Sequence, residues 1–237
     1  MSTTPKMSVE EIRARFDQEV ERFSNLATGQ VATVDATLCL ELVTKAAAAS
    51  SPQAVQALDV GCGAGNYSLK LREYLPEVRV NLIDLSQAML DRARERLGSA
   101  VESAQAADIR TLDFPAGRFD IILASAVLHH LRTPQEWELV FGKFHRWLKP
   151  GGGLWVFDLI AYENPAVHRL MWERYGRFLE AKGGASYRDH VFDYIEREDT
   201  PTSLPYQLEL MRRAGFASID VLHKNSCFAA FGGSKGG

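Results

Sequence analysis

A short apolar run, a glycine-rich turn and a helix-forming segment follow one another in this chain and constrain its fold more than any other feature. Residues 55–60 are mostly apolar and predict a strand that is buried on both faces. Gly61, Gly63 and Gly65 follow, and glycine both adopts positive φ and lets a ligand approach the backbone. Residues 67–74 predict a helix. Because the first N–H groups of a helix are free to bind a ligand, the turn predicts a seat for a nucleotide or an anion.

The next strand narrows this ligand to a nucleotide or a nucleoside. Residues 80–84, Val-Asn-Leu-Ile-Asp, predict a strand that ends on Asp84, about 20 residues beyond the turn. A carboxylate at this place accepts hydrogen bonds from ribose hydroxyls. The NAD-binding pattern would have its third glycine at position 66, which is Asn66. A nicotinamide-dependent oxidoreductase is therefore the less favoured interpretation.

Four motifs in this order resemble the class I S-adenosylmethionine (SAM)-dependent methyltransferases. They are Leu58-Asp59-Val60-Gly61-Cys62-Gly63-Ala64-Gly65, Leu82-Ile83-Asp84-Leu85-Ser86, Ala107-Asp108-Ile109 with Phe119-Asp120-Ile121-Ile122, and Leu148-Lys149-Pro150-Gly151-Gly152. The resemblance implies an α/β, Rossmann-like fold with a mostly parallel seven-stranded sheet, an antiparallel C-terminal hairpin strand and helices on both faces. It also implies SAM as the cofactor and S-adenosylhomocysteine as its product.

The same resemblance assigns expected roles to the motif residues. The residues that are expected to contact the cofactor are Asp59, Gly61, Cys62, Gly63, Gly65, Asp84, Leu85, Met89, Asp108, Ile109, Ala124 and Ser125. Among them, Asp84 is expected to accept both ribose hydroxyls, and Asp108 with Ile109 to meet the adenine. Asp59 either helps to hold the amino end of SAM or only orients the amides of the turn. Cys62 is expected to pack rather than to react, since no base for a nucleophile accompanies it.

Two adjacent histidines are the candidate catalytic residues. His129 and His130 follow the fourth predicted strand in a string that resembles many small-molecule methyltransferases. Either imidazole could act as a general base toward the acceptor, because an unperturbed histidine has a pKa of ~6.5. Alternatively, they cap local backbone. No acidic metal cluster lies beside the motifs, so no metal is predicted.

The chain divides into N-terminal helices, residues 1–50, and a cofactor-binding core, residues 51–237, with a helical insertion at about 160–199. The N-terminal helices, expected over 9–26 and 34–49, either fold over the cofactor and the acceptor or only cover apolar sheet surface. The remaining expected strands are 101–107, 119–124, 154–159, 218–223 and 227–231, and residues 232–237 are expected to be disordered. Further pocket candidates in the insertion are His168, Trp172, Tyr175, Tyr187, His190 and Tyr194.

Charge and composition bound the partners. A formal net charge of −3 gives no general attraction to phosphate backbones, so no nucleic acid is expected. The three cysteines are widely spaced, as is usual for reduced thiols. No apolar run approaches the ~20 residues that span a bilayer, and the first residues lack the apolar segment of a signal peptide. We therefore expect a cytoplasmic protein that does not enter membranes, while the oligomeric state, with a homodimer as one option, stays open.

The resulting prediction is a SAM-dependent methyltransferase that acts on a small molecule. The insertion and the segment Arg213-Ala214-Gly215-Phe216 also resemble the carboxy-SAM synthases of tRNA wobble-uridine modification, in which an arginine holds the added carboxylate. Arg188 is a candidate for that arginine, but the Gly61–Gly65 turn departs from the pattern of those enzymes. A SAM-binding interaction module without activity is the third alternative.

Overall fold

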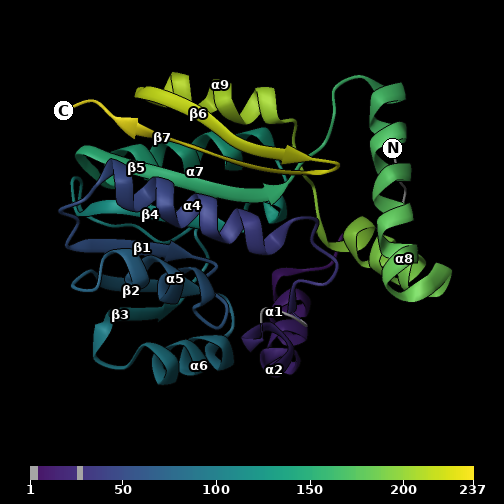
Figure 1. The fold of residues 1–237 in the computed structure, drawn as a ribbon, viewed down its shortest axis with the longest axis horizontal. Helices are drawn as coiled ribbons and strands as arrows, with labels where there is room; N and C mark the ends of the chain where they lie inside the picture. Colours follow the sequence, from purple (N-terminus) through teal and green to yellow (C-terminus); the bar gives the residue numbers. More distant parts are fainter. Residues whose placement is uncertain (1–4, 26–28) are drawn as a thin grey trace.

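Seven strands form one sheet in the computed structural model, which describes residues 5–25 and 29–237. Their order is β3-β2-β1-β4-β5-β7-β6 (Figure 1). The strands are β1 Gln56–Val60, β2 Arg79–Asp84, β3 Val101–Ala106, β4 Phe119–Ser125, β5 Leu148–Leu159, β6 Phe216–Asn225 and β7 Phe228–Lys235. Strand β7 is antiparallel to β5 and to β6, whereas β1 to β5 pair in parallel. The predicted sheet is thereby confirmed.

Helices cover both faces of this sheet. One face carries α4 (Ala36–Ser50), α5 (Asn66–Tyr74) and α6 (Gln87–Leu97), and the other carries α7 (Pro134–Trp147) and α9 (Leu204–Ala214) (Figure 1). The buried apolar side chains of the two groups form two separate clusters. The aromatic stripe of α7 lies in the second cluster and is almost fully buried, as is typical of the core face of an amphipathic helix: Trp137, Phe141, Phe144 and Trp147.

The strand order reverses between β1 and β4, and this reversal places the site. The chain runs from β1 outward to β2 and β3, then returns to β4 on the other side of β1. In open parallel sheets a ligand binds beyond the carboxyl ends of the strands at such a switch point. The Gly61–Gly65 turn follows β1 there, and the 3₁₀ turn Leu128–His130 lies just beyond β4.

The N-terminal segment forms two helices instead of the single one expected over 9–26. Helix α1 (Val9–Gln18) begins with a capping box of Ser8 and Glu11, and α2 (Val20–Ser24) follows after a break at Glu19. The expected end at Leu26 lies outside the described residues. Both helices lie beside α6 (Figure 1), and Ser86 donates a hydrogen bond of 2.5 Å from its Oγ to Oδ1 of Asp17.

The insertion is one long element, α8 (Pro165–Glu198), which stands at one end of the molecule (Figure 1). Asn164, followed by Pro165, is a typical helix start, and it caps α8 by accepting hydrogen bonds from the N–H groups of Ala166 and Val167. In the sequence, Gly183 and Gly184 predict an end to this helix. Instead, it is kinked at Gly184 (φ 79°, ψ −178°) and then continues, so the glycine supplies a bend rather than an end.

The disorder expected over residues 232–237 is wrong for most of that range, because β7 extends to Lys235. Gly232 and Gly233 pair with Trp155 and Leu154 of β5. A Cβ at Gly232 would lie 2.3 Å from Cε3 of Trp155, and a Cβ at Gly233 would lie 2.1 Å from the carbonyl oxygen of Ser218. These glycines therefore allow close strand packing, although their composition resembles that of a flexible tail. No helix in the described residues is long and apolar enough to cross a membrane.

Candidate active site

The glycines of the turn have the backbone conformation that the sequence predicts. Gly61, Gly63 and Gly65 have φ values of 63°, 49° and 80°. A Cβ at Gly61 would lie 2.5 Å from Cγ2 of Val127, so close packing excludes a side chain there as well. At Gly63 no heavy atom would lie within 4 Å of a Cβ. The first glycine thus lets the loop after β4 approach the turn, and the second leaves open space beside it.

Asp84 at the end of β2 is held by two backbone donors. Its Oδ2 accepts a hydrogen bond from the N–H of Gly63 at 2.8 Å, and its Oδ1 accepts one from the N–H of Ser86 at 2.9 Å. Burial raises the pKa of Asp84 above its ordinary value, against the effect of these hydrogen bonds. Each carboxylate oxygen has a second lone pair, so the group is fixed and can still accept two ribose hydroxyls.

A cleft with about 890 Å³ of empty space, part of it open to solvent, lies over this turn and is called the turn cleft below. The expected cofactor residues that line it are Gly61, Cys62, Gly63, Asp84, Leu85, Met89 and Ser125. The residues that sequence reasoning missed are Phe16, Phe23, Gly29, Gln30, Thr33, Ala64, Asn66, Tyr67, Ala126, Val127 and Phe157, and the candidate His130 completes the lining. The segment around α1 and α2 therefore closes one side of the cleft, as in the first alternative for the N-terminal helices. Helix α4 covers apolar sheet surface, as in the second.

A smaller cavity, the side pocket, adjoins the turn cleft at Gly61, Asp84 and Leu85. Both expected adenine contacts, Asp108 and Ile109, line it. Burial raises the pKa of Asp108, but its hydrogen bonds with Arg110 outweigh this effect and lower the pKa overall. The carboxylate therefore stays charged and can accept a hydrogen bond from an amino group.

Three expected cofactor residues line neither the turn cleft nor the side pocket: Asp59, Gly65 and Ala124. Asp59 is 2% exposed and accepts a hydrogen bond of 2.6 Å from Oγ of Ser68. Burial raises its pKa to about 7. Ala124 is fully buried in β4, and it is Ala126, with a positive φ of 53°, that reaches the cleft. Positive φ in an alanine costs conformational energy and leaves no mark in a sequence.

A second cleft of about 700 Å³ shares a wall with the turn cleft. The shared residues are Phe16, Phe23, Gly29, Thr33, Ala126, His130 and Phe157. Its remaining lining combines apolar and aromatic side chains with charged and imidazole groups: Arg15, Arg22, Ala32, His129, Asp158, Leu159, Tyr175, Tyr194, Ile195, Asp199 and Phe228. Of the pocket candidates in the insertion, this cleft contains Tyr175 and Tyr194.

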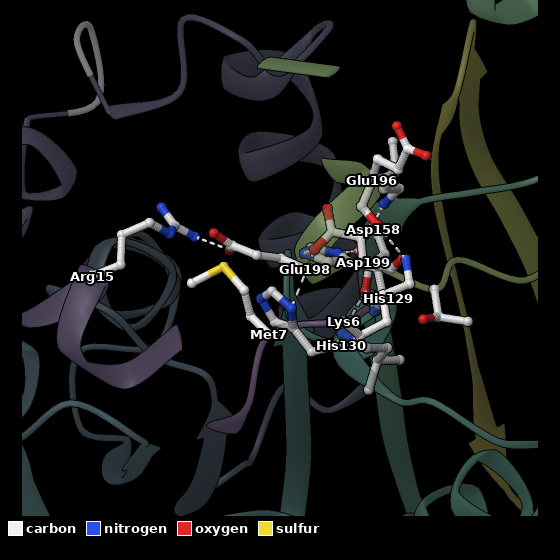
Figure 2. Close-up of polar contacts among 12 residues, drawn as sticks. Lys6, Met7, Arg15, His129, His130, Asp158, Glu196, Glu198 and Asp199 are labelled. Atoms are coloured by element: carbon white, nitrogen blue, oxygen red, sulfur yellow. Dashed lines mark hydrogen bonds and ion pairs between the residues drawn. The ribbon is translucent and has the colours of Figure 1, made fainter. Parts of the chain in front are cut away.

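His129 lines the second cleft and is held between the carboxylates of Asp158 and Asp199 (Figure 2). Its Nδ1 contacts Oδ1 of Asp158, and its Nε2 lies 3.7 Å from Oδ1 of Asp199. Asp158 is 1% exposed and also accepts a hydrogen bond from the N–H of Leu128 at 2.7 Å. Burial lowers the pKa of His129, but the two carboxylates outweigh burial and raise it to about 9.

His130 is the residue that all three cavities share. Its Nδ1 lies 3.2 Å from Oδ1 of Asp199, which is only 5% exposed (Figure 2). The N–H of Thr200 donates a hydrogen bond of 2.7 Å to the carbonyl oxygen of His129, so the segment after α8 is fixed against the loop after β4. Sequence reasoning missed Asp158 and Asp199, because only the fold brings them to the histidines.

Arg188 lies outside both clefts. Its guanidinium forms ion pairs with Glu180 and Asp189, both on α8. It lines an open cavity between the two halves of that helix. The structure therefore does not bring Arg188 to the cofactor, whereas Arg15 and Arg22 of the N-terminal helices do line the second cleft.

Burial raises the pKa of the Cys62 thiol well above its usual range, so this thiol stays protonated.

Comparisons with known proteins match both the motifs and the fold. Residues 57–152 match the family model of a methyltransferase domain. A carboxy-S-adenosyl-L-methionine synthase of Campylobacter lari is 22% identical over 81% of this chain and 82% of its own length. A trans-aconitate 2-methyltransferase of Azoarcus sp. is 37% identical over 56% of this chain, which covers 49% of that relative.

A solved structure of the 1,6-didemethyltoxoflavin-N1-methyltransferase of Burkholderia thailandensis, with bound 1,6-didemethyltoxoflavin and S-adenosylhomocysteine, has the same fold. It superposes with a TM-score of 0.64 and 18% identity over all of this chain and 94% of that one. The glycine turn, the acid after β2, the strand order with its antiparallel β7 and the matched domain agree with one another. Together, the matched domain, the relatives and the fold support a class I SAM-dependent methyltransferase.

Proposed function

We propose that the enzyme binds SAM in the turn cleft and methylates a small, partly aromatic molecule in the second cleft. The observation that carries this proposal is the wall between the clefts. Ala126, His130 and Phe157 belong to both, so a methyl group at this wall would face a molecule on its other side. Methyl transfer depends chiefly on holding the acceptor atom near ~3 Å from the methyl carbon and in line with the bond that breaks.

For the cofactor we propose the following placement. Asp84 accepts the ribose hydroxyls, Asp108 and Ile109 meet the adenine in the side pocket, and Ser125 lies beside the methionine portion. Asp59 acts from beneath the turn, through Ser68 and the start of α5, because it does not reach the cleft. Aromatic side chains of the N-terminal helices, Phe16 and Phe23, exclude water from this side of the cofactor.

The reaction needs only a lone pair on the acceptor and a place for its proton. The acceptor atom attacks the methyl carbon, the carbon–sulfur bond breaks, and its electron pair stays on sulfur, which gives neutral S-adenosylhomocysteine. A proton on the acceptor passes to a base or to water. The group His129, His130, Asp158 and Asp199 lies at the shared wall, and we propose that it positions the acceptor's polar atom there.

The acceptor we propose has a flat apolar body and at least one polar atom. Phe157, Tyr175 and Phe228 offer aromatic surface in the second cleft, and Tyr175 is fixed by a hydrogen bond of 2.8 Å from its hydroxyl to the carbonyl oxygen of Ala32. The charged groups of the lining are two arginines, two aspartates and the imidazole of His129, whose pKa is raised to about 9, so no large net charge on the acceptor is preferred. We further propose that the acceptor is a small molecule rather than a nucleic acid, and that the protein is cytoplasmic. Light scattering would determine whether it is a homodimer.

One observation supports a second candidate function, synthesis of carboxy-SAM. The likeness to the Campylobacter lari synthase covers most of both chains. A carboxylate on the cofactor's transferred carbon would need a cation near the shared wall, and Arg15 lines the second cleft with an Nε that has no hydrogen-bond partner in the described residues. Its Nη2 forms an ion pair with Glu198 at 2.6 Å, and this pair weakens the attraction of Arg15 for a second carboxylate. For this reason we rank the synthase second.

Mass spectrometry of the small molecules released from freshly purified, denatured protein separates these candidates. SAM or S-adenosylhomocysteine supports the methyltransferase, and the purified enzyme is then screened for transfer of isotope-labelled methyl from SAM to flat hydroxy, amino and carboxylic acid compounds. Carboxy-SAM supports the synthase. Protein that binds SAM but transfers methyl to none of these acceptors would favour a SAM-binding interaction module. An Arg15→Gln variant is the matched test, because it should abolish retention of carboxy-SAM and leave retention of SAM unchanged.

A further inference from the structure

We infer that His129, His130 and Asp199 form a binding site for a divalent first-row transition metal ion at the wall between the two clefts. One potential ligand atom from each of these three residues lies within 4.8 Å of the other two. Two imidazoles and one carboxylate on one side of an ion are a frequent ligand set for such metals. This inference rests on the proposed function, in which these residues position the polar atom of the acceptor, because the metal ion would be what holds that atom.

The separations between the ligand atoms fit a common ion. Oδ1 of Asp199 lies 3.2 Å from Nδ1 of His130 and 3.7 Å from Nε2 of His129. Two ligand atoms that are each about 2.1 Å from a metal lie about 3.0 to 3.4 Å apart at octahedral or tetrahedral angles. A small movement of the His129 ring would bring the longer separation into this range.

Two of the three ligand atoms are buried and form no hydrogen bond of good geometry with the described residues. Nδ1 of His130 and Oδ1 of Asp199 are buried, and neither has a hydrogen-bond partner in residues 5–25 and 29–237, although they lie near each other. The Asp199 side chain is 5% exposed. Their contact with each other is an ion pair at 3.2 Å, and a metal ion bound between the two atoms would accept the lone pairs of both.

The surroundings of the group are those of a metal site. Asp158 contacts the other nitrogen of His129, Nδ1, and so fixes the ring with Nε2 toward Asp199 (Figure 2). Carboxylates commonly orient metal-bound histidines in this way. Binding of the ion displaces the proton from each nitrogen that becomes a ligand, and Asp158 and Asp199 together then balance the two positive charges of the ion.

The open coordination positions would face the acceptor. All three ligands line the second cleft, and His130 also lines the turn cleft, where the cofactor binds. The ion would bind an oxygen or nitrogen atom of the acceptor and hold its lone pair toward the transferred methyl group. Acceptors with a hydroxyl or carboxylate next to the methylated atom, which can bind such an ion through two atoms, are therefore the favoured class.

Metal titration of the full chain tests the site. Protein treated with EDTA and desalted is titrated with Zn²⁺ by calorimetry and with Co²⁺ by visible absorption, and the same samples are titrated with SAM. We expect one ion per chain, with affinity at least 100-fold lower in Asp199→Asn and in His130→Gln. Asp158→Asn should bind about 10-fold more weakly because it only orients a ligand. His190→Gln, which changes an exposed histidine of α8 outside both clefts, is the control and should bind as the wild type does.

The possible results are distinguishable. Wild-type protein that binds SAM but neither metal overturns the metal site and leaves the proposed function intact. Equal metal binding by wild type and Asp199→Asn also overturns it, because the ion must then lie elsewhere. Binding of metal without SAM would contradict the proposed function instead. If the variants do not fold, X-ray absorption of the Co²⁺ protein decides: about two imidazoles per ion support the site, and none contradicts it.

Discussion

Asp158, near the end of β5, accepts a hydrogen bond of 2.7 Å from the backbone N–H of Leu128, in the loop after β4. The other oxygen of the same carboxylate contacts the imidazole of His129 and accepts a hydrogen bond from the N–H of Leu159 at 2.7 Å. One buried side chain thus fixes both the loop and the ring that it carries. Geometry at the wall between the clefts depends on this aspartate.

Replacing Asp158 by Asn should therefore reduce turnover without weakening cofactor binding. The oxygen of an amide can still accept a hydrogen bond from the N–H of Leu128. Its NH₂ group cannot accept a hydrogen bond from Nδ1–H of His129, so the ring loses its orientation. We expect kcat to fall about 10- to 100-fold. The Kd for SAM should change less than twofold, because Asp158 does not line the turn cleft. Asp220→Asn, at an exposed position of β6, is the control, and a kcat as low in this control as in Asp158→Asn would contradict the assignment.

Gly61→Ala should abolish SAM binding by moving the loop after β4. The new Cβ would lie 2.5 Å from Cγ2 of Val127, and the alanine would also have to adopt a positive φ. We expect the Kd for SAM to rise at least 100-fold in a titration. Gly98→Ala isolates the second effect, since Gly98 has a φ of 56°, no heavy atom within 4 Å of a Cβ, and a place at the end of α6. If both variants bind SAM as the wild type does, close packing at Gly61 is unimportant.

The turn and its acid were predicted from the sequence because their chemistry is local. A strand, three glycines and Asp84 occur at fixed spacing, and the backbone explains each residue. The second cleft could not be predicted in this way. Asp158 belongs to an otherwise apolar strand, and nothing in the sequence pairs it with His129. Asp199 contacts His130 only because the kinked α8 returns the chain to the loop after β4. Likewise, Ala126 carries no sign of its positive φ, and Gly232 resembles a tail residue until its contact with Trp155 is known.

Asp59 should make the stability of the protein depend on pH between about 4 and 7. Burial raises its pKa to about 7 in the folded chain, from an ordinary value of 3.8. A carboxyl with a raised folded pKa contributes stability that is fully present below the unfolded pKa and is lost as pH rises through the folded pKa. In Asp59→Asn this loss is absent, so the free energy of unfolding of the variant, relative to wild type, should increase by up to about 4 kcal/mol from pH 4 to pH 8.

Urea unfolding of both proteins at several pH values measures this difference. Glu73→Gln, on the exposed side of α5, provides a control in which one carboxylate is removed without a change in burial. Parallel curves for wild type and Asp59→Asn across this pH range would show that the buried carboxyl has no raised pKa.

The three cysteines should react slowly in the folded protein. All are buried, and burial raises the pKa of the Cys39 and Cys227 thiols to about 12 and the pKa of the Cys62 thiol well above its usual range. We expect iodoacetamide at pH 8 to modify native protein at least 100-fold more slowly than protein unfolded in urea, because the thiolate is the reacting form. Cys62→Ala should retain turnover within about threefold. A large loss of kcat in this variant with unchanged SAM binding would give Cys62 a chemical role.

Titration of SAM into the purified chain by calorimetry tests the central claim most directly. Wild-type protein should bind one SAM per chain with a Kd between about 1 µM and 1 mM. Asp84→Ala should bind at least 10-fold more weakly, because it removes both charge-assisted acceptors for the ribose. Asp91→Ala, an exposed acid on α6, should bind as the wild type does. No heat at millimolar SAM, or equal affinity of wild type and Asp84→Ala, would contradict the account.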